Sequence, residues 1–407
     1  MTWLVVAVGL LLLIYLHELG HFGVALAVGL RPRGFYIGFG PLLAGFRRRG
    51  VEYGIRAIPA GGYVRIPGMN RPSPRDLDAF MASALREQPD LSAYVQHVRR
   101  PLEAGDFAAA AAALPELRSA IDAADLTPAA RRPADRALRQ IDEDTGPDAY
   151  WRAPVWRRIA VIAAGPGANM LVAFLIFMIV YATGAPTSNA TTKVAQVEAG
   201  TPAAAAGLHV GDRVVAVDGR TAHTFNALSA RIRASHGRAI TVTVVRRGRR
   251  ITLGPKATEK VNGRYIWGFV PAAQLVAYPL GHSARLAVND CWQVATGTVS
   301  AFGAIFHKKE RGQLTSAVGI VRVSQAALKI GFSYYLQIVG LVSMSLALLN
   351  LLPFLPLDGG HILFSVIEAV RRRAVAKEVY ERVSVFGFAL IMLLTFIALN
   401  NDIFGQH

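Results

Sequence analysis

The stretch Leu10–Leu30, "LLLLIYLHELGHFGVALAVGL", places two histidines and a glutamate inside one of the most apolar runs of the chain. About 20 consecutive apolar residues are enough for a helix to cross the hydrocarbon core of a bilayer. A charge at the centre of such a helix costs about 2.5–3.5 kcal/mol on insertion scales, so an ionisable residue there indicates a function. His17, Glu18 and His21 are therefore the first candidates for a functional site.

Three further windows are apolar over a membrane-spanning length and contain no Lys, Arg, Asp or Glu: Ile159–Tyr181, Ile330–Leu357 and Val383–Asn400. Charged residues make up 17% of the chain, whereas soluble proteins average about 25%. Four buried core helices of a soluble domain are the alternative, but these runs are too long and too continuously apolar for it. We expect a multi-pass α-helical membrane protein with four transmembrane helices.

Arginines beside these windows account for much of the net charge of +17. They follow the first window, precede the second, and lie between the third and the fourth. They are Arg31, Arg33, Arg47, Arg48, Arg49, Arg157, Arg158, Arg371, Arg372 and Arg373. Basic residues mark the cytoplasmic flanks of spans and contact anionic lipid. We therefore expect these connections to lie in the cytoplasm, with the lipid bilayer as a partner and no nucleic acid. The basic stretch Arg246–Arg250 carries little weight, since long loops translocate largely regardless of charge.

Two contrasting segments separate the first window from the second. Residues 31–69 are rich in Gly and aromatic residues and alternate in "VEYGIRAI", which predicts a membrane-associated β-hairpin. Residues 70–150 are Ala-rich and charged, and "DFAAAAAALPELRSAIDAADL" and "PAARRPADRALRQIDED" predict a pair of helices. We interpret this segment as a cytoplasmic helical insertion that is structural or regulatory.

Short alternating strands and one helix-like stretch predict a compact α+β domain over residues 190–272. Its stretch Gly200–Arg220, "GTPAAAAGLHVGDRVVAVDGR", resembles the PDZ domains of bacterial membrane-associated proteases, at Ala206, Gly207, Leu208, Gly211 and Asp212. That resemblance implies an extracytoplasmic domain that binds extended peptides or substrate segments at a sheet edge.

The pattern His17-Glu18-x-x-His21 predicts a metal site. Positions i and i+4 share one face of a helix, so both imidazoles can reach one ion. Zn²⁺ accepts such ligands and tolerates an open position for a water molecule, whose pKa the metal lowers to about 7 and whose proton Glu18 can accept as general base. The single cysteine, Cys291, excludes a cysteine-rich metal cage. Two buried structural histidines are the alternative, and they leave Glu18 unexplained.

A third ligand is expected from "NLLPFLPLDGGH", Asn350–His361, where Asp358 follows a long uncharged run. Prolines and glycines there break the helix, and irregular backbone is tolerated at membrane depth only around a cavity or within protein. Such a bend can bring the Asp358 carboxylate toward the first span. An aspartate that merely marks the membrane boundary is the alternative.

Together these features resemble the site-2 protease family of intramembrane zinc metalloproteases, in the bacterial branch that cleaves anti-sigma factors and signal-peptide remnants. The resemblance rests on "HELGH", "GFG", "GGYV", "AGPGAN" (Ala164–Asn169), the PDZ-like stretch and "LDG". It departs from the family at residues 70–150 and at "SAVGI", Ser316–Ile320. It implies His17, His21 and Asp358 as zinc ligands, Glu18 as catalytic base, and regulated intramembrane proteolysis of single-pass substrates. It also implies a protein of the bacterial inner membrane whose active site lies toward the cytoplasm.

The same resemblance implies substrate handling by Asn350 and by the hairpin. A strand edge near Val51–Ile58 or Gly61–Val64 would pair with unwound substrate, which makes Gly61 and Gly62 candidate substrate-binding residues. A polar contact between two helices is an equally good explanation for Asn350. Two roles are possible for His361: it could lie at the membrane interface, or it could contact and orient a metal ligand.

The expected boundaries divide the chain into eight segments: transmembrane helix 1 (1–30), the hairpin (31–69), the insertion (70–150), transmembrane helix 2 (156–182), the PDZ domain (190–272), an amphipathic connector (273–329), transmembrane helix 3 (330–358) and transmembrane helix 4 (383–401). The leading function is a zinc metalloendopeptidase. A catalytically silent PDZ-bearing scaffold and an ion or proton carrier are the alternatives; the intact His17, Glu18, His21 and Asp358 disfavour the first, and the few polar residues in the other spans disfavour the second.

Overall fold

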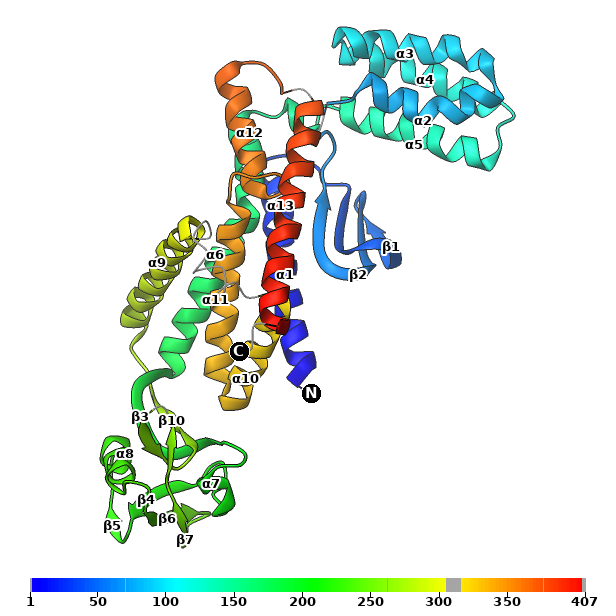
Figure 1. The fold of residues 1–407 in the computed structure, drawn as a ribbon. Helices are drawn as coiled ribbons and strands as arrows, with labels where there is room; N and C mark the ends of the chain where they lie inside the picture. The colour runs from blue at the N-terminus through cyan, green and yellow to red at the C-terminus, as the bar shows by residue number, and fades with distance from the viewer. Residues whose placement is uncertain (1, 70, 262, 305–315, 376, 405–407) are drawn as a thin grey trace. The chain divides into compact units, whose positions relative to one another are not determined.

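The computed structural model describes the chain except for residues 1, 70, 262, 305–315, 376 and 405–407. The chain divides into two compact units (Figure 1). The first comprises Met1–Val6, Val172–Gly297 and Thr315–Val342, and the second comprises Ala7–Leu171, the described part of Thr298–Leu314, and Ser343–His407. Each unit is treated by itself below.

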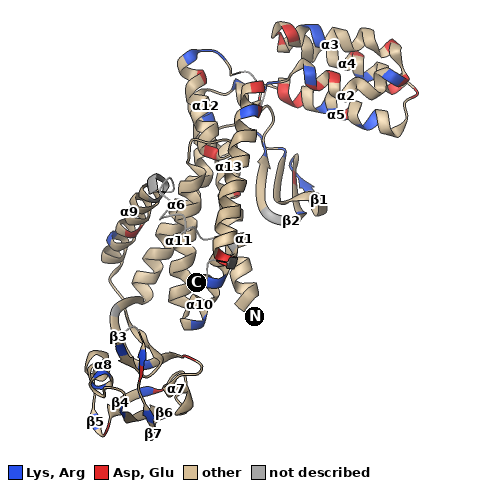
Figure 2. Ribbon diagram, viewed as in Figure 1, with Lys and Arg blue, Asp and Glu red and all other residues tan. Residues whose placement is uncertain are grey.

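Four helices are long and apolar enough to cross a membrane: α1 (Thr2–Ala27), α6 (Val155–Thr183), α11 (Phe332–Asn350) and α13 (Lys377–Phe404). Figure 2 shows these helices largely free of charged residues, whereas both signs of charge are interspersed on the helices of residues 74–145. The prediction of a multi-pass helical protein with an inserted β-containing region is confirmed.

The third span differs from its expected range of 330–358. Helix α11 ends at Asn350, residues 351–357 are not helical, and α12 (Asp358–Arg371) begins at Asp358. Pro353 and Pro356 explain the break, because proline lacks the amide proton that a continuing helix needs. Gly387 of α13 has no side chain, and a Cβ there would collide with the carbonyl oxygen of Leu355. The broken segment therefore packs against α13 at Leu355, which is buried.

The hairpin is built from β1 (Gly34–Arg48) and β2 (Val51–Arg65), each long enough to bend back on its partner. Residues 44–48 pair with 51–55, while residues 34–37 pair with 52–55 on one side and with 62–65 on the other. Phe35 and Val51 are buried against Phe22 of α1, which fixes one face of the hairpin on the first span. Residues 62–65 form an edge of this sheet.

Residues 74–145 form four helices where the sequence predicted two: α2 (Pro74–Glu87), α3 (Ser92–Ala104), α4 (Phe107–Ala123) and α5 (Pro128–Thr145). The predicted pair corresponds to α4 and α5. The unpredicted α2 buries Leu77, Met81 and Ala84, which share one helix face because they are four and three residues apart. The four helices bury a common hydrophobic core of their own.

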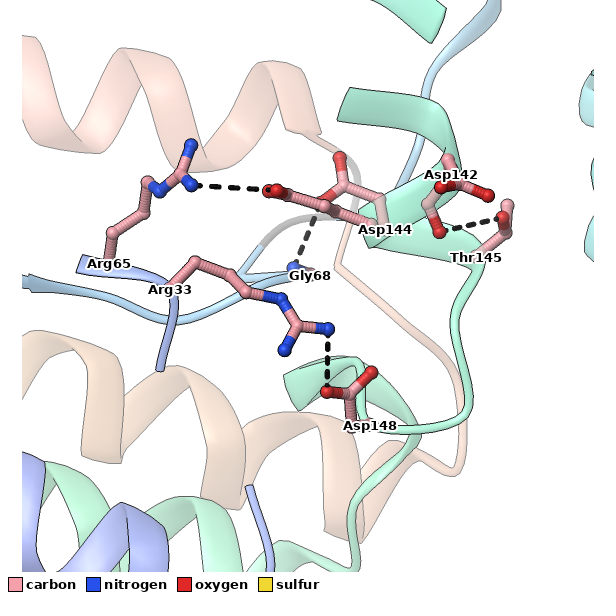
Figure 3. A network of polar contacts seen from close by, with 8 residues as sticks. Arg33, Arg65, Gly68, Asp142, Asp144, Thr145 and Asp148 are labelled. Atoms are coloured by element: carbon pink, nitrogen blue, oxygen red, sulfur yellow. Dashed lines mark hydrogen bonds and ion pairs between the residues drawn. The ribbon is translucent and has the colours of Figure 1, made fainter. Parts of the chain in front are cut away.

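Polar contacts join the end of α5 to the base of the hairpin (Figure 3). The Arg33 guanidinium lies 3.0 Å from the Asp148 carboxylate, and Arg65 lies 3.5 Å from Glu143. The backbone amide of Gly68 donates to Asp144 at 2.9 Å. The helical insertion is therefore attached at the strand that runs into the candidate site.

The first unit contains a six-stranded sheet with the order β10-β3-β4-β6-β7 and β5 beside β4. Its longer strands are β3 (Ala185–Val197), β6 (Ala239–Arg246), β7 (Arg249–Ala257) and β10 (Phe269–Val276), with β4 (Arg213–Val217) and β5 (Arg220–Thr221) shorter. Helices α7 (Pro202–Ala205) and α8 (Phe225–Ala234) accompany the sheet, and β8 (Glu259–Val261) pairs with β9 (Arg264–Ile266). Buried Leu228, Val242 and Trp267 form the core of this domain. Helices α9 (Leu280–Ala304) and α10 (Ala317–Ile330) follow.

Candidate metal centre

Three side chains from two distant segments converge in the second unit. His17 and His21 lie one turn apart on α1, and Asp358 is the first residue of α12. Their ligand atoms form a nearly equilateral triangle: 3.2 Å between the two Nε2 atoms, and 3.2 and 3.4 Å from these atoms to Asp358 Oδ2. The break after α11 thus places the expected carboxylate beside both imidazoles.

This triangle fits Zn²⁺. Bonds of about 2.0–2.1 Å in a tetrahedral site put neighbouring ligand atoms about 3.3 Å apart. Apart from the two imidazole nitrogens, the buried Asp358 Oδ2 has no polar partner among the described residues, so it has a lone pair available for a metal. Two neutral imidazoles and one carboxylate also leave a fourth position for water.

A second layer of contacts orients the imidazoles. His21 Nδ1 donates to the carbonyl oxygen of Val161 in α6 at 2.8 Å, so its Nε2 lone pair is free for a metal. His17 Nδ1 lies 3.3 Å from the side-chain amide of Asn169, a fully buried residue of α6. Asn169 Oδ1 has no partner among the described residues. If the Asn169 amide is turned to present Oδ1, this oxygen accepts a hydrogen bond from the Nδ1–H group of His17. The lone pair of His17 Nε2 is then also free for a metal.

No role for Val161 or Asn169 was predicted from the sequence. The signal for Asn169 was present, because an amide within an apolar span needs a partner. Val161 acts through its backbone carbonyl, so its side chain gives no signal. Gly165, between them on α6, leaves the space that the two imidazoles occupy.

A cavity of about 460 Å³ opens beside the triangle. Glu18 lines it, and only 8% of this residue is exposed. The other residues predicted to handle substrate also line the cavity: Gly61 and Gly62 of β2 and Asn350 at the end of α11. His361 lies at the same cavity and packs against the Tyr380 ring at 5.8 Å. The structure therefore brings every sequence-predicted site residue to one place.

Glu18 and Gly62 are in close contact. A Cβ on Gly62 would lie 2.7 Å from Glu18 Cγ and 2.9 Å from the Tyr36 carbonyl oxygen. The absence of a side chain at Gly62 therefore lets the edge strand pass directly beside the glutamate. A buried carboxylate next to a three-ligand metal site is the arrangement for metal-assisted hydrolysis.

Comparison with known proteins agrees with this geometry. The sequence profile of peptidase family M50 matches residues 5–394. The protein mll0638 of Mesorhizobium japonicum is 28% identical over 412 residues, covering 97% of this chain and 96% of its own. Metalloprotease MmpA of Caulobacter vibrioides is 28% identical over 413 residues (95% and 91%), and zinc metalloprotease RasP of Geobacillus kaustophilus is 28% identical over 416 residues (96% and 95%).

Proposed function

Because this chain belongs to peptidase family M50 and is a multi-pass zinc metalloprotease, we propose that it hydrolyses peptide bonds within or beside the transmembrane helices of single-pass proteins. The convergence of His17, His21 and Asp358 beside Glu18 carries this proposal. Two of these ligands belong to a span, and the end of another span, at Asn350, lines the same cavity. A transmembrane substrate can therefore meet the site at membrane depth.

The proposed roles follow from the chemistry of each group. His17, His21 and Asp358 would hold the zinc ion, which would supply a Lewis acid that lowers the pKa of a water molecule to about 7. Glu18 accepts a proton from the attacking water and returns it to the leaving amine. Its buried position beside the ligands keeps bulk water away from this proton transfer. Val161 and Asn169 hold the imidazoles in the orientation that zinc requires.

The hairpin offers a template for the substrate backbone. A helical substrate has its amides bonded internally, and the protease needs an extended strand. Of the two expected edges, Val51–Ile58 is paired on both sides at residues 52–55, whereas residues 62–65 pair only with 34–37 among the described residues. The edge at Gly61–Val64 is therefore the one that we assign to the unwound substrate, with backbone hydrogen bonds giving affinity.

We assign the sheet domain of the first unit to substrate selection, as a PDZ domain on the extracytoplasmic side. The active site then faces the cytoplasm, in agreement with the arginines that flank the spans. Anti-sigma factors and signal-peptide remnants are the substrate classes that the family resemblance implies. In this scheme the PDZ domain admits substrates that another protease has already trimmed.

One experiment tests the proposed reaction. Wild type, Glu18→Gln and Asp358→Ala are purified in detergent, bound zinc is measured, and cleavage of a single-span substrate is assayed. We expect wild type and Glu18→Gln to bind zinc, only wild type to cleave, and Asp358→Ala to lose zinc affinity. Equal cleavage by wild type and Glu18→Gln would remove Glu18 from the mechanism. Unchanged zinc affinity in Asp358→Ala would show that the third ligand is misassigned.

A further inference from the structure

A second cavity, of about 470 Å³, lies between α1 and the hairpin and contains none of the residues of the metal centre. Tyr15, Leu19 and Phe22 line it from α1. The rest of the wall comes from hairpin residues, mainly Phe35, Ile37, Ala44, Phe46, Tyr53 and Ile55. Among its lining side chains only the two tyrosine hydroxyls are polar. This cavity is referred to below as the aromatic groove.

The aromatic groove lies at membrane depth. Tyr15, Leu19 and Phe22 belong to the span α1 and, being four and three residues apart, share one helix face. His17 and His21 occupy a different face of the same helix. Apart from the two tyrosine hydroxyls, the side chains of the groove offer water no hydrogen-bond partners, so hydrocarbon fills it more favourably than water does.

An arginine follows the lining residue Phe46 on the same strand, two residues further on. Phe46 pairs with Tyr53, and their rings stack at 5.2 Å. Side chains two residues apart on a strand point to the same face, so Arg48 lies on the face of Phe46, where it pairs with Val51 beside the turn. The Arg48 side chain is exposed, and within the part of the chain that the structure describes it makes no hydrogen bond or ion pair. Arg48 does not line the groove itself, but its guanidinium follows the aromatic ring of Phe46 on the same face of the strand.

We propose that the aromatic groove binds an anionic phospholipid, with an acyl chain along the aromatic side chains and the phosphate on Arg48. Guanidinium groups bind phosphate through charge-assisted hydrogen bonds. A substrate helix is the competing occupant, but the cytoplasmic flanks of spans are enriched in Lys and Arg, which Arg48 repels. Charge complementarity therefore favours the lipid. This inference does not depend on peptidase activity.

The test measures lipids that remain bound to the full-length protein. Wild type is reconstituted in bilayers of equal phosphatidylcholine and phosphatidylglycerol, released into detergent, and examined by native mass spectrometry. We expect wild type to retain phosphatidylglycerol in preference to phosphatidylcholine. Arg48→Gln should lower this preference about fivefold, the factor expected for one basic residue at an anionic surface. Arg250→Gln, which removes an exposed arginine from β7 in the other unit, is the matched control and should retain the wild-type preference.

A second variant tests the acyl-chain part of the site. Ala44→Trp fills the groove while keeping every arginine, so we expect it to lose the retained phospholipid. The bound zinc of each variant reports that it has folded. Equal retention of the two lipids by wild type, or unchanged retention by both Arg48→Gln and Ala44→Trp, would overturn the proposal. If Ala44→Trp instead slowed cleavage without changing lipid retention, the groove would be a substrate site.

Discussion

Gly165 of α6 lies so close to the imidazole of His21 that no side chain fits between them. A Cβ built on Gly165 would collide with His21 Nε2 and lie 2.8 Å from His17 Nε2. The backbone of the second span therefore forms the wall against which both metal-binding rings pack. Together with the Val161 carbonyl and the Asn169 amide, it fixes where the ligand atoms point.

Substitution of this glycine should disable the metal site without unfolding the helix. We expect Gly165→Ala to lower zinc affinity at least about tenfold, because displaced ligands bind more weakly. Gly167→Ala is the matched control, since a Cβ there meets nothing within 4 Å, and alanine stabilises a helix interior by about 0.5–1 kcal/mol over glycine. Zinc titration of the two purified variants checks this. Equal affinities would show that the rings do not depend on the α6 backbone.

Asn169 should act through His17 alone. Asn169→Ala removes the group that orients the His17 ring, and loss of such a partner typically costs about 10–100-fold in metal affinity. The control is Ser343→Ala, because the Ser343 hydroxyl donates to the backbone carbonyl of Asn169 at 2.8 Å and does not touch the ring. Zinc titration distinguishes the two. A similar loss in both variants would mean that packing of α6, not the amide, supports the site.

The parts of this site that the sequence predicted are those with a local pattern. His17 and His21 are four residues apart on one helix, and the cost of ionisable groups at membrane depth marks them together with Glu18. The Pro and Gly residues around Asp358 indicated a break in the third span. What remained hidden is contact between segments far apart in sequence: Val161 is 140 residues from His21, and its carbonyl belongs to no motif.

In the fold, too, the features that the sequence predicted are those with a local pattern. Continuous apolar runs predicted the four spans, because their length and composition are local properties. The helices α2 and α3 were not predicted, although their buried residues recur every three or four positions, as Leu77, Met81 and Ala84 do in α2. The helix end at Asn350 agrees with the break that the prolines indicated, although the apolar run itself continues through them.

Gly62 should affect the reaction rate more than metal binding. In Gly62→Ala the new methyl group would press on Glu18 Cγ, which is not a ligand. A displacement of about 1 Å can cost about 100-fold in rate, so we expect kcat to fall by that order while zinc binding persists. Gly23→Ala on α1, where a Cβ meets nothing within 4 Å, should leave both unchanged. Loss of zinc from Gly62→Ala would contradict the separation of base and ligands.

The ion pair between Arg158 of α6 and Glu368 of α12 should stabilise the helix that begins with Asp358. The two groups are 2.7 Å apart and only 10% and 18% exposed, and Glu368 also accepts from the Val375 amide at 3.0 Å. Removing one partner of a buried pair costs about 3–5 kcal/mol, because the other charge is left uncompensated. We therefore expect Arg158→Met to lower the Tm markedly in detergent.

An exposed ion pair of the same type provides the control. Arg75 lies 2.6 Å from Glu378, but the two side chains are 77% and 44% exposed. Such pairs contribute about 0.2–1 kcal/mol, so Arg75→Met should change the Tm only slightly. Equal shifts for Arg158→Met and Arg75→Met would show that the buried pair does not hold α12.

Attachment of the helical insertion should depend on pH through Asp144. Burial raises the pKa of this carboxyl from 3.8 to about 6, although the Gly68 amide favours the charged form. The folded protein then binds a proton that the unfolded chain releases, so the stabilisation is complete below about pH 4 and is lost as pH rises through 6. We expect the Tm to fall between pH 4 and 6 relative to that of Asp144→Asn, which retains an oxygen for the Gly68 amide but cannot ionise. Asp142→Asn, which alters an exposed carboxyl two residues away, should follow the wild-type curve. Parallel curves for wild type and Asp144→Asn would show that burial does not raise the pKa of the Asp144 carboxyl in the folded protein.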